Sequence, residues 1–138
     1  MGIKKILIVD DDPDICNSMR VRLKANDFDT FFATDAVSTL SQARKHEPDL
    51  IILDLGLPTG DGFAVLEKLK VWPCLALIPV IVVSARDLCR NKERAMKAGA
   101  KAYLQKPVDN AELLNVIQQA LGESAHSEYP VGQGSNTN

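Results

Sequence analysis

Short runs of continuous apolar residues, many of them β-branched, recur along the chain. The three clearest span residues 6–9, 50–53 and 80–83. Continuous rather than alternating apolar runs are typical of strands buried on both faces, as in a parallel sheet covered by helices. Two weaker runs, residues 28–33 and 102–105, predict two further strands.

Segments with helical spacing follow each of these runs. Ile15, Met19 and Leu23 fall on one helical face after Asp12, which is a good N-cap. Four further helices are predicted: one capped by Asp35 with Ala36, Leu40 and Ala43 inward, one over Gly62–Lys70, one over Asp87–Ala98 ended by Gly99, and one opened by Asp109 and Glu112 and running to Leu121.

This strand-then-helix repetition predicts an α/β fold. The expected architecture is a doubly wound five-stranded parallel sheet with right-handed crossovers and helices on both faces. Residues 1–122 are expected to form one domain. Residues 123–138 are rich in Ser, Gly, Asn and Pro, so they are predicted to be a flexible tail or the start of a linker.

Composition excludes several classes of protein. Three cysteines without metal-ligand spacing indicate a reduced protein rather than a disulfide framework. No apolar run approaches the ~20 residues that span a bilayer, and no signal peptide opens the chain, so a soluble cytoplasmic protein without membrane contact is expected. A net charge of −2 without a basic recognition helix argues against direct nucleic-acid binding.

The acidic residues are unevenly divided, with 12 Asp against 6 Glu. Asp favours helix caps, turns and metal sites, so the excess directs attention to where the Asp residues lie. The predicted caps and turns account for five of them: Asp12, Asp35, Asp61, Asp87 and Asp109.

Polar residues follow four of the predicted strands directly. Asp10 and Asp11 follow the first strand, Asp54 the third, Ser84 the fourth and Lys106 the fifth. In an open parallel sheet the ligand site lies outside the carboxyl ends of the strands. Each residue alone has a simpler interpretation, as a turn acid, a turn serine or a surface lysine, but their joint placement predicts one site.

Several carboxylates that close together repel one another unless a cation lies among them. Oxygen ligands with room for water suit Mg²⁺. With that ion bound, one carboxylate can attack phosphorus and form an aspartyl phosphate, while a lysine offsets charge on the transferring oxygens. The strand ends therefore predict a phosphoryl-transfer site.

Four motifs at these positions resemble the receiver domain of bacterial two-component response regulators, the family of the single-domain chemotaxis regulator. They are ILIVDDDPDI at 6–15, LIILDLGLPTGDG at 50–62, VIVVSA at 80–85 and AYLQKPV at 102–108. The resemblance covers about residues 3–121. It implies a flavodoxin-like sheet of strand order 2-1-3-4-5.

By this resemblance Asp54 is the phosphoacceptor and receives its group from a phosphohistidine of a sensor histidine kinase or a histidine phosphotransfer protein. Asp10 and Asp11 match the family's acidic pair. The resemblance implies that Asp11 and Asp54 ligate Mg²⁺ together with the backbone carbonyl of Gly56. It implies a signalling domain of a phosphorelay rather than an enzyme, one that assists its own phosphorylation and dephosphorylation.

The resemblance also implies a switch. Ser84 and Lys106 would contact the phosphoryl oxygens, Lys106 would precede a cis Pro107, and Tyr103 would turn inward as Ser84 moves. These movements would remodel the face formed by the fourth helix, the fifth strand and the fifth helix, which an effector domain or a dimer partner would read.

One position departs from the family pattern, and two others lie where the family varies its rate of phosphoryl hydrolysis. Val108 follows Pro107 where many members carry Phe. Gly56 and Arg86 occupy positions that influence how fast the phosphoryl group hydrolyses, and Gly56 is predicted to leave the approach of water open, whereas Arg86 could partly cover it.

The main alternative is a phosphohydrolase of the haloacid dehalogenase type, which also uses an aspartyl phosphate and Mg²⁺. Residues 10–12 supply its DxD, but Asp14 stands where Thr or Val belongs. A flavodoxin-type mononucleotide binder needs a hydroxyl- and amide-rich phosphate loop after the first strand, where three acids would repel phosphate. A degenerate receiver is disfavoured because every expected site residue is present.

Overall fold

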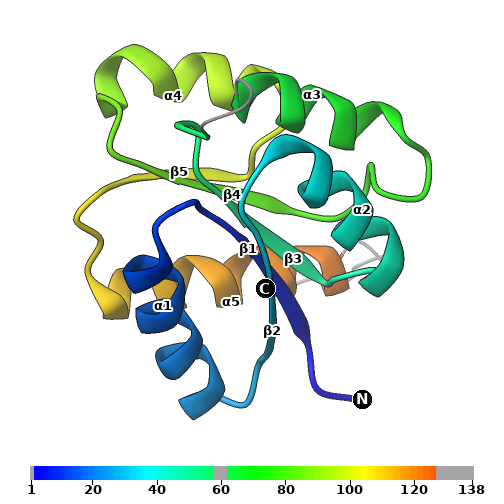
Figure 1. The fold of residues 1–138 in the computed structure, drawn as a ribbon, viewed down its shortest axis with the longest axis vertical. Helices are drawn as coiled ribbons and strands as arrows, with labels where there is room; N and C mark the ends of the chain where they lie inside the picture. The colour runs from blue at the N-terminus through cyan, green and yellow to red at the C-terminus, as the bar shows by residue number, and fades with distance from the viewer. Residues whose placement is uncertain (1, 58–61, 127–138) are drawn as a thin grey trace.

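The computed structural model describes residues 2–57 and 62–126. Within these residues strands and helices alternate along the chain (Figure 1). The strands are β1 (Lys5–Val9), β2 (Asp29–Ala33), β3 (Leu50–Leu53), β4 (Val80–Ser84) and β5 (Ala102–Gln105). The helices are α1 (Pro13–Ala25), α2 (Ala36–His46), α3 (Gly62–Val71), α4 (Leu88–Lys97) and α5 (Asn110–His126).

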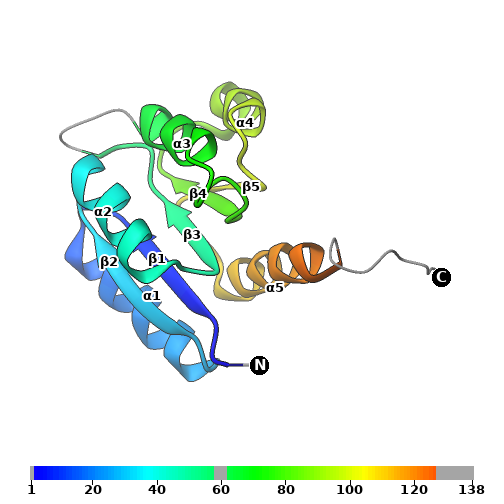
Figure 2. The ribbon, with the colours of Figure 1, turned by 90° about the vertical axis from the view of Figure 1, so that its right-hand side faces the viewer.

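The five strands form one parallel sheet in the order β2-β1-β3-β4-β5. Helices α1 and α5 cover one face, and α2, α3 and α4 cover the other (Figures 1 and 2). The predicted doubly wound sheet and its strand order are therefore confirmed. The reversal of winding between β1 and β3 places the carboxyl ends of these two strands side by side.

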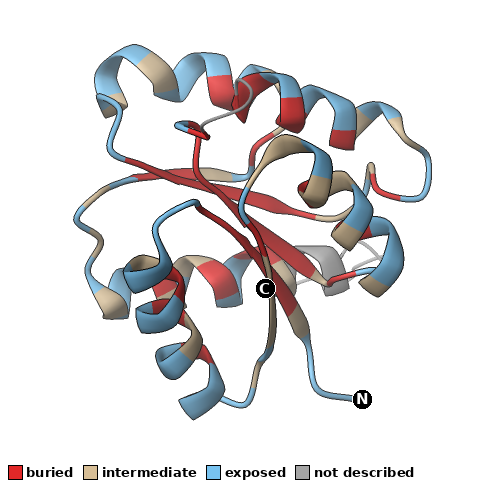
Figure 3. Cartoon of the chain, viewed as in Figure 1, coloured by how far each residue is buried: buried red, intermediate tan, exposed pale blue. Residues whose placement is uncertain are grey.

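The continuous apolar strands are explained by two separate cores, because successive side chains of a strand point to opposite faces. In β3, Ile51 and Leu53 pack with α2, α3 and α4, whereas Leu50 and Ile52 pack with α1 and α5. Figure 3 shows the central strands buried along their length while the outer faces of the helices are exposed. Both faces of the sheet therefore need apolar residues.

Aspartates begin four of the helices, as predicted. The carboxylates of Asp12, Asp35, Asp87 and Asp109 each accept a hydrogen bond from a backbone N–H of the first helical turn. The turn expected at Asp61 lies outside the described residues. Asp35 and Ser38 form a reciprocal capping box, and their backbone hydrogen bond holds the pKa of Asp35 below its ordinary value.

Two details differ from the sequence prediction. Cys16, Met19 and Leu23 are the buried residues of α1, while Ile15 is only half-buried. Helix α5 continues to His126, past the boundary predicted at Gly122, because a glycine inside a helix costs only about 1 kcal/mol and no proline follows it there. Residues 127–138 of the tail predicted over residues 123–138 lie outside the described residues. No helix in the described part of the chain is long and apolar enough to cross a membrane.

Candidate functional site

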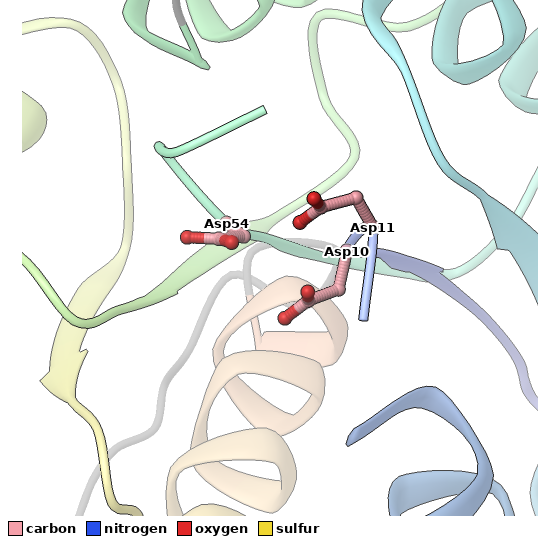
Figure 4. A group of neighbouring side chains, drawn as sticks. All are labelled: Asp10, Asp11 and Asp54. Atoms are coloured by element: carbon pink, nitrogen blue, oxygen red, sulfur yellow. The ribbon is translucent and has the colours of Figure 1, made fainter. Parts of the chain in front are cut away.

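Three carboxylates gather where β1 and β3 end (Figure 4). The backbone brings them together, because the N–H of Asp54 donates to the carbonyl of Val9 at 2.9 Å and fixes the end of β3 against β1. One carboxylate oxygen each from Asp10, Asp11 and Asp54 lie within 4.8 Å of one another. Asp10 and Asp54 are buried, whereas Asp11 is exposed and opens the cluster to solvent.

Lys106 reaches this cluster from the end of β5. Its Nζ lies 2.7 Å from Oδ2 of Asp10 and 3.5 Å from Oδ2 of Asp54. Burial alone lowers the pKa of Lys106, but the hydrogen bond to Asp10 and the charges of Asp54 and Asp10 outweigh it, so the pKa lies above its ordinary value. The ammonium is therefore fully charged at neutral pH.

Backbone N–H groups bind the remaining oxygens of the two buried acids. Oδ1 of Asp10 accepts from the N–H of Asp12 at 3.0 Å, and Oδ1 of Asp54 accepts from the N–H of Gly56 at 3.1 Å. Three carboxylates still face one ammonium, which leaves an excess of negative charge. The donor set and this excess fit a hard divalent cation such as Mg²⁺.

Ser84 lies beside Lys106 at the same edge of the sheet. Its carbonyl oxygen accepts from the N–H of Lys106 at 2.8 Å, and its hydroxyl accepts from the N–H of Arg86 at 3.1 Å. The side chain is buried. Asp10, Asp11, Asp54, Ser84 and Lys106 are thus brought to one edge by four strands, as the sequence predicted.

Gly62 allows α3 to begin directly on the backbone that carries Asp54. Its N–H donates to the carbonyl of Leu55 at 3.1 Å. A Cβ at this position would lie 2.4 Å from Cα of Leu55 and 2.9 Å from the carbonyl oxygen of Asp54. Only glycine permits this approach. The sequence pattern predicted Gly62 at the start of this helix but did not indicate its contact with the backbone of Asp54.

This arrangement of carboxylates, lysine and serine coincides with a family match. The sequence matches the response regulator receiver domain over residues 6–118, which includes every strand end described above. The chain belongs to this family.

Several characterised proteins resemble this receiver domain. The KDP operon transcriptional regulatory protein KdpE of Escherichia coli K12 is 38% identical, and the match covers 91% of this chain and 54% of KdpE. A CheY-like receiver domain protein of Methanospirillum hungatei JF-1 superimposes with a TM-score of 0.84 at 31% identity, covering 91% of this chain and 99% of that one. This chain therefore spans about half the length of KdpE.

A third relative bears on the acidic cluster. The receiver domain of the sensor histidine kinase PA1611 of Pseudomonas aeruginosa PAO1 has a TM-score of 0.80 at 26% identity, covering 88% of this chain and 99% of that one. Its structure holds a magnesium ion coordinated in the active site cleft.

Tyr103 of the receiver domain already points inward from β5, without the movement of Ser84 that the resemblance implied. The ring is buried, and its hydroxyl donates to the carbonyl of Arg86 at 2.9 Å. Burial raises the pKa of Tyr103 above its ordinary value, so the hydroxyl stays protonated at neutral pH. The hydroxyls of Tyr103 and Ser84 therefore both hydrogen-bond to the backbone of Arg86. Arg86 is the residue before Asp87, which caps α4. The peptide bond between Lys106 and Pro107 is cis, as the resemblance implied.

Cys16 lies beneath the acidic cluster, a position that the sequence pattern did not predict. Its Sγ donates to the carbonyl of Asp10 at 3.3 Å. Burial, followed by the charges of Asp10 and Asp12, raises the pKa of Cys16 to about 11. The sequence contained a pattern that could have predicted the burial of Cys16, since Cys16, Met19 and Leu23 also share one helical face.

The three thiols are expected to react very differently with iodoacetamide at pH 8. Cys74 and Cys89 are exposed and should be alkylated within minutes, whereas Cys16 is buried and almost wholly protonated, so it should react at least about a hundredfold more slowly. Peptide mass mapping at timed intervals measures this. Alkylation in denaturant serves as the control, and equal rates in the folded protein would contradict the buried position.

Proposed function

We propose that Asp54 is the phosphoacceptor of this receiver domain and takes its phosphoryl group from a phosphohistidine of a sensor histidine kinase or a histidine phosphotransfer protein. The observation that supports this most directly is the convergence of Asp10, Asp11, Asp54 and Lys106 at one sheet edge. A carboxylate flanked by an ammonium and by two further acids is equipped to accept an electron-poor phosphorus when a divalent cation is bound.

In this transfer a carboxylate oxygen of Asp54 attacks phosphorus. The new O–P bond forms as the P–N bond breaks, and the electron pair remains on the imidazole nitrogen. The N–H of Gly56 and the ammonium of Lys106 hold the carboxylate in place at 3.1 and 3.5 Å. Hydrolysis later adds water to phosphorus and releases phosphate and the free carboxylate.

Asp10, Asp11 and Asp54, with the carbonyl of Gly56, are the groups proposed to hold Mg²⁺. Asp11 is the most open of the three acids, while Asp10 is already engaged by Lys106 and by the N–H of Asp12. Bound Mg²⁺ supplies positive charge for the phosphoryl oxygens. The magnesium ion in the PA1611 receiver domain supports this assignment.

Ser84 and Tyr103 are proposed to transmit the modification. The Ser84 hydroxyl now accepts from the N–H of Arg86, so turning toward a phosphoryl group on Asp54 would release that N–H. Tyr103 holds the carbonyl of the same residue. Because Asp87, the cap of α4, comes next, a change at Arg86 reaches the face formed by α4, β5 and α5, which we propose binds an effector domain or a dimer partner.

The test is modification by a small phosphodonor. Incubation with acetyl phosphate and Mg²⁺ should give one phosphoryl adduct per chain by intact mass spectrometry, and chelation of Mg²⁺ should reduce its formation at least about tenfold. Lack of any adduct, or an adduct on another residue, would overturn the proposal. Sustained turnover of a generic phosphate ester would instead favour the haloacid dehalogenase alternative, since a receiver is modified once and returns slowly.

Gly56 is expected to control the lifetime of the adduct. A Cβ at Gly56 would lie 3.8 and 3.9 Å from the two carboxylate oxygens of Asp54, so a longer side chain would stand over the path of the attacking water. Gly56→Asn is expected to slow dephosphorylation about fivefold, which corresponds to about 1 kcal/mol in the activation free energy. The measurement is loss of labelled phosphate after removal of the donor, with Gly122→Ala as a distant control. An unchanged rate would remove this role.

A further inference from the structure

A groove between α2 and the residue that follows α3 has no part in the phosphoryl-transfer site. It has a volume of about 580 Å³ and is lined by Val37, Leu40, Ser41, Arg44, Lys45 and Trp72. The lining residues of α2 recur at helical spacing, so one stripe of that helix faces the groove. Both helices cover the same face of the sheet (Figures 1 and 2).

One apolar residue of the groove is open to solvent. Val37 is 80% exposed, whereas Leu40 and Trp72 are half-buried and pack against the core. The positive charges of Arg44 and Lys45 at the end of α2 are explained within the helix, because cations near a helix C-terminus interact favourably with the helix dipole. No such effect within the helix explains why Val37, an apolar residue in the first turn of α2, is exposed.

Trp72 forms a fixed wall of the groove. Its N–H donates to the carbonyl of Lys68, and its own carbonyl accepts from the N–H groups of Leu75 and Ala76. The guanidinium of Arg44 lies over the indole ring, 5.0 Å from its centroid. An incoming apolar side chain would therefore meet an ordered aromatic surface flanked by positive charge.

We propose that this groove binds an acidic amphipathic helix of a partner protein. Its apolar side chains would pack on Val37, Leu40 and Trp72, and its carboxylates would pair with Arg44 and Lys45. Charge selects this occupant, because the lining residues carry two cations and no acid, and α2 carries no acidic residue from Ala36 to His46. The surface is separate from the α4–β5–α5 face, so this proposal does not depend on the phosphoacceptor proposal.

Other occupants fit less well. In a symmetric dimer built on this groove the same cations would face one another, which is repulsive. A lipid surface is flat and contacts protruding groups, whereas these residues line a hollow. Nucleic acid gains nothing from exposed aliphatic side chains such as Val37, and the groove has few cations to contact phosphates.

The chain provides its own reporter, because Trp72 is its single tryptophan. The probe is a synthetic helix of about 18 residues made of leucine, glutamate and alanine, and the control probe replaces each glutamate with lysine. Titration at low salt should change the Trp72 emission saturably below about 1 mM acidic peptide, and the lysine peptide should bind at least about tenfold more weakly.

Exposed-residue variants locate the binding. Lys45→Glu should weaken binding of the acidic peptide about tenfold, and Val37→Ser should weaken it several-fold. Lys92→Glu on α4 makes the same charge change at a distant exposed position, so it should alter the affinity less than about twofold. All three should keep the parent circular dichroism. No saturable change, equal binding of both peptides, or equal behaviour of Lys45→Glu and Lys92→Glu would overturn the proposal.

Three parallel measurements identify a wrong occupant. An emission shift with phosphatidylglycerol vesicles in place of the peptide would indicate a membrane surface. Concentration-dependent dimerisation lost in Lys45→Glu would indicate a second copy. A changed Trp72 emission after deletion of residues 127–138 would indicate that the chain covers its own groove. Each of these results would overturn the proposed partner helix and identify that other occupant of the groove.

Discussion

Replacing Asp54 with asparagine is expected to abolish the phosphoryl adduct formed with acetyl phosphate and Mg²⁺. The amide keeps the shape of the side chain but lacks the negatively charged oxygen that attacks phosphorus. It also removes one of three proposed metal ligands and leaves Lys106 with Asp10 as its remaining carboxylate contact. Intact mass spectrometry should show less than about a hundredth of the parent adduct.

Asp12→Asn is the matched control for this substitution. Asp12 lies beside the cluster but caps α1 through the N–H of Asp14, and asparagine caps helices equally well. The control should retain the adduct within about twofold of the parent. An adduct that persists in Asp54→Asn would eliminate Asp54 as the acceptor, and a loss shared by both variants would point to a general effect of charge instead.

Gly62→Ala is expected to cause the largest loss of stability among single-methyl changes near the site. The added Cβ would meet Cα of Leu55 at 2.4 Å, and backbone cannot yield as the end of a flexible side chain can. We expect the free energy of unfolding in urea to fall by about 3 kcal/mol. Phosphorylation should also slow at least about tenfold, because α3 can relieve the clash only by displacing the backbone that carries Asp54.

Gly122→Ala is the corresponding control. Gly122 lies inside α5, and a Cβ there meets nothing within 4 Å. Alanine should therefore stabilise the protein by about 0.5–1 kcal/mol through helix propensity alone and leave phosphorylation unchanged. If the two glycine variants had the same stability, the close approach at Gly62 would not be as the structure describes.

Local chemistry carried most of the fold prediction. The apolar runs located the strands to within one residue at each end, and four Asp N-caps gave the starts of α1, α2, α4 and α5. The predicted end of α5 was wrong. The Ser- and Gly-rich composition after Gly122 suggested a tail, but four more residues are helical. Helix ends depend on small differences in propensity that composition does not resolve.

The inward face of α1 shows a related limit. Residues at helical spacing define two neighbouring stripes in this helix, and the predicted inward stripe was the one that contains Ile15. The structure buries Cys16 more deeply, where its thiol donates to the carbonyl of Asp10, while Ile15 packs half-buried against the same core. Only the rotation of α1 against the sheet decides between the two stripes.

By itself, the sequence determined which chemical groups meet in this protein. Parallel strands deliver whatever follows them to a single edge, so Asp10, Asp11, Asp54, Ser84 and Lys106 could be assigned to one site from their positions in the chain. All five positions lie within residues 6–118, which match the receiver family.

Tertiary structure alone decided how these groups are arranged and what else the surface offers. It placed Lys106 closer to Asp10 than to Asp54, seated α3 on the backbone of Asp54 through Gly62, and assembled a groove from α2 and Trp72. The first and third of these depend on distances between elements far apart in the chain, and the second depends on how closely α3 packs against the end of β3. Such distances are set by the packing of both cores together, which no local pattern encodes.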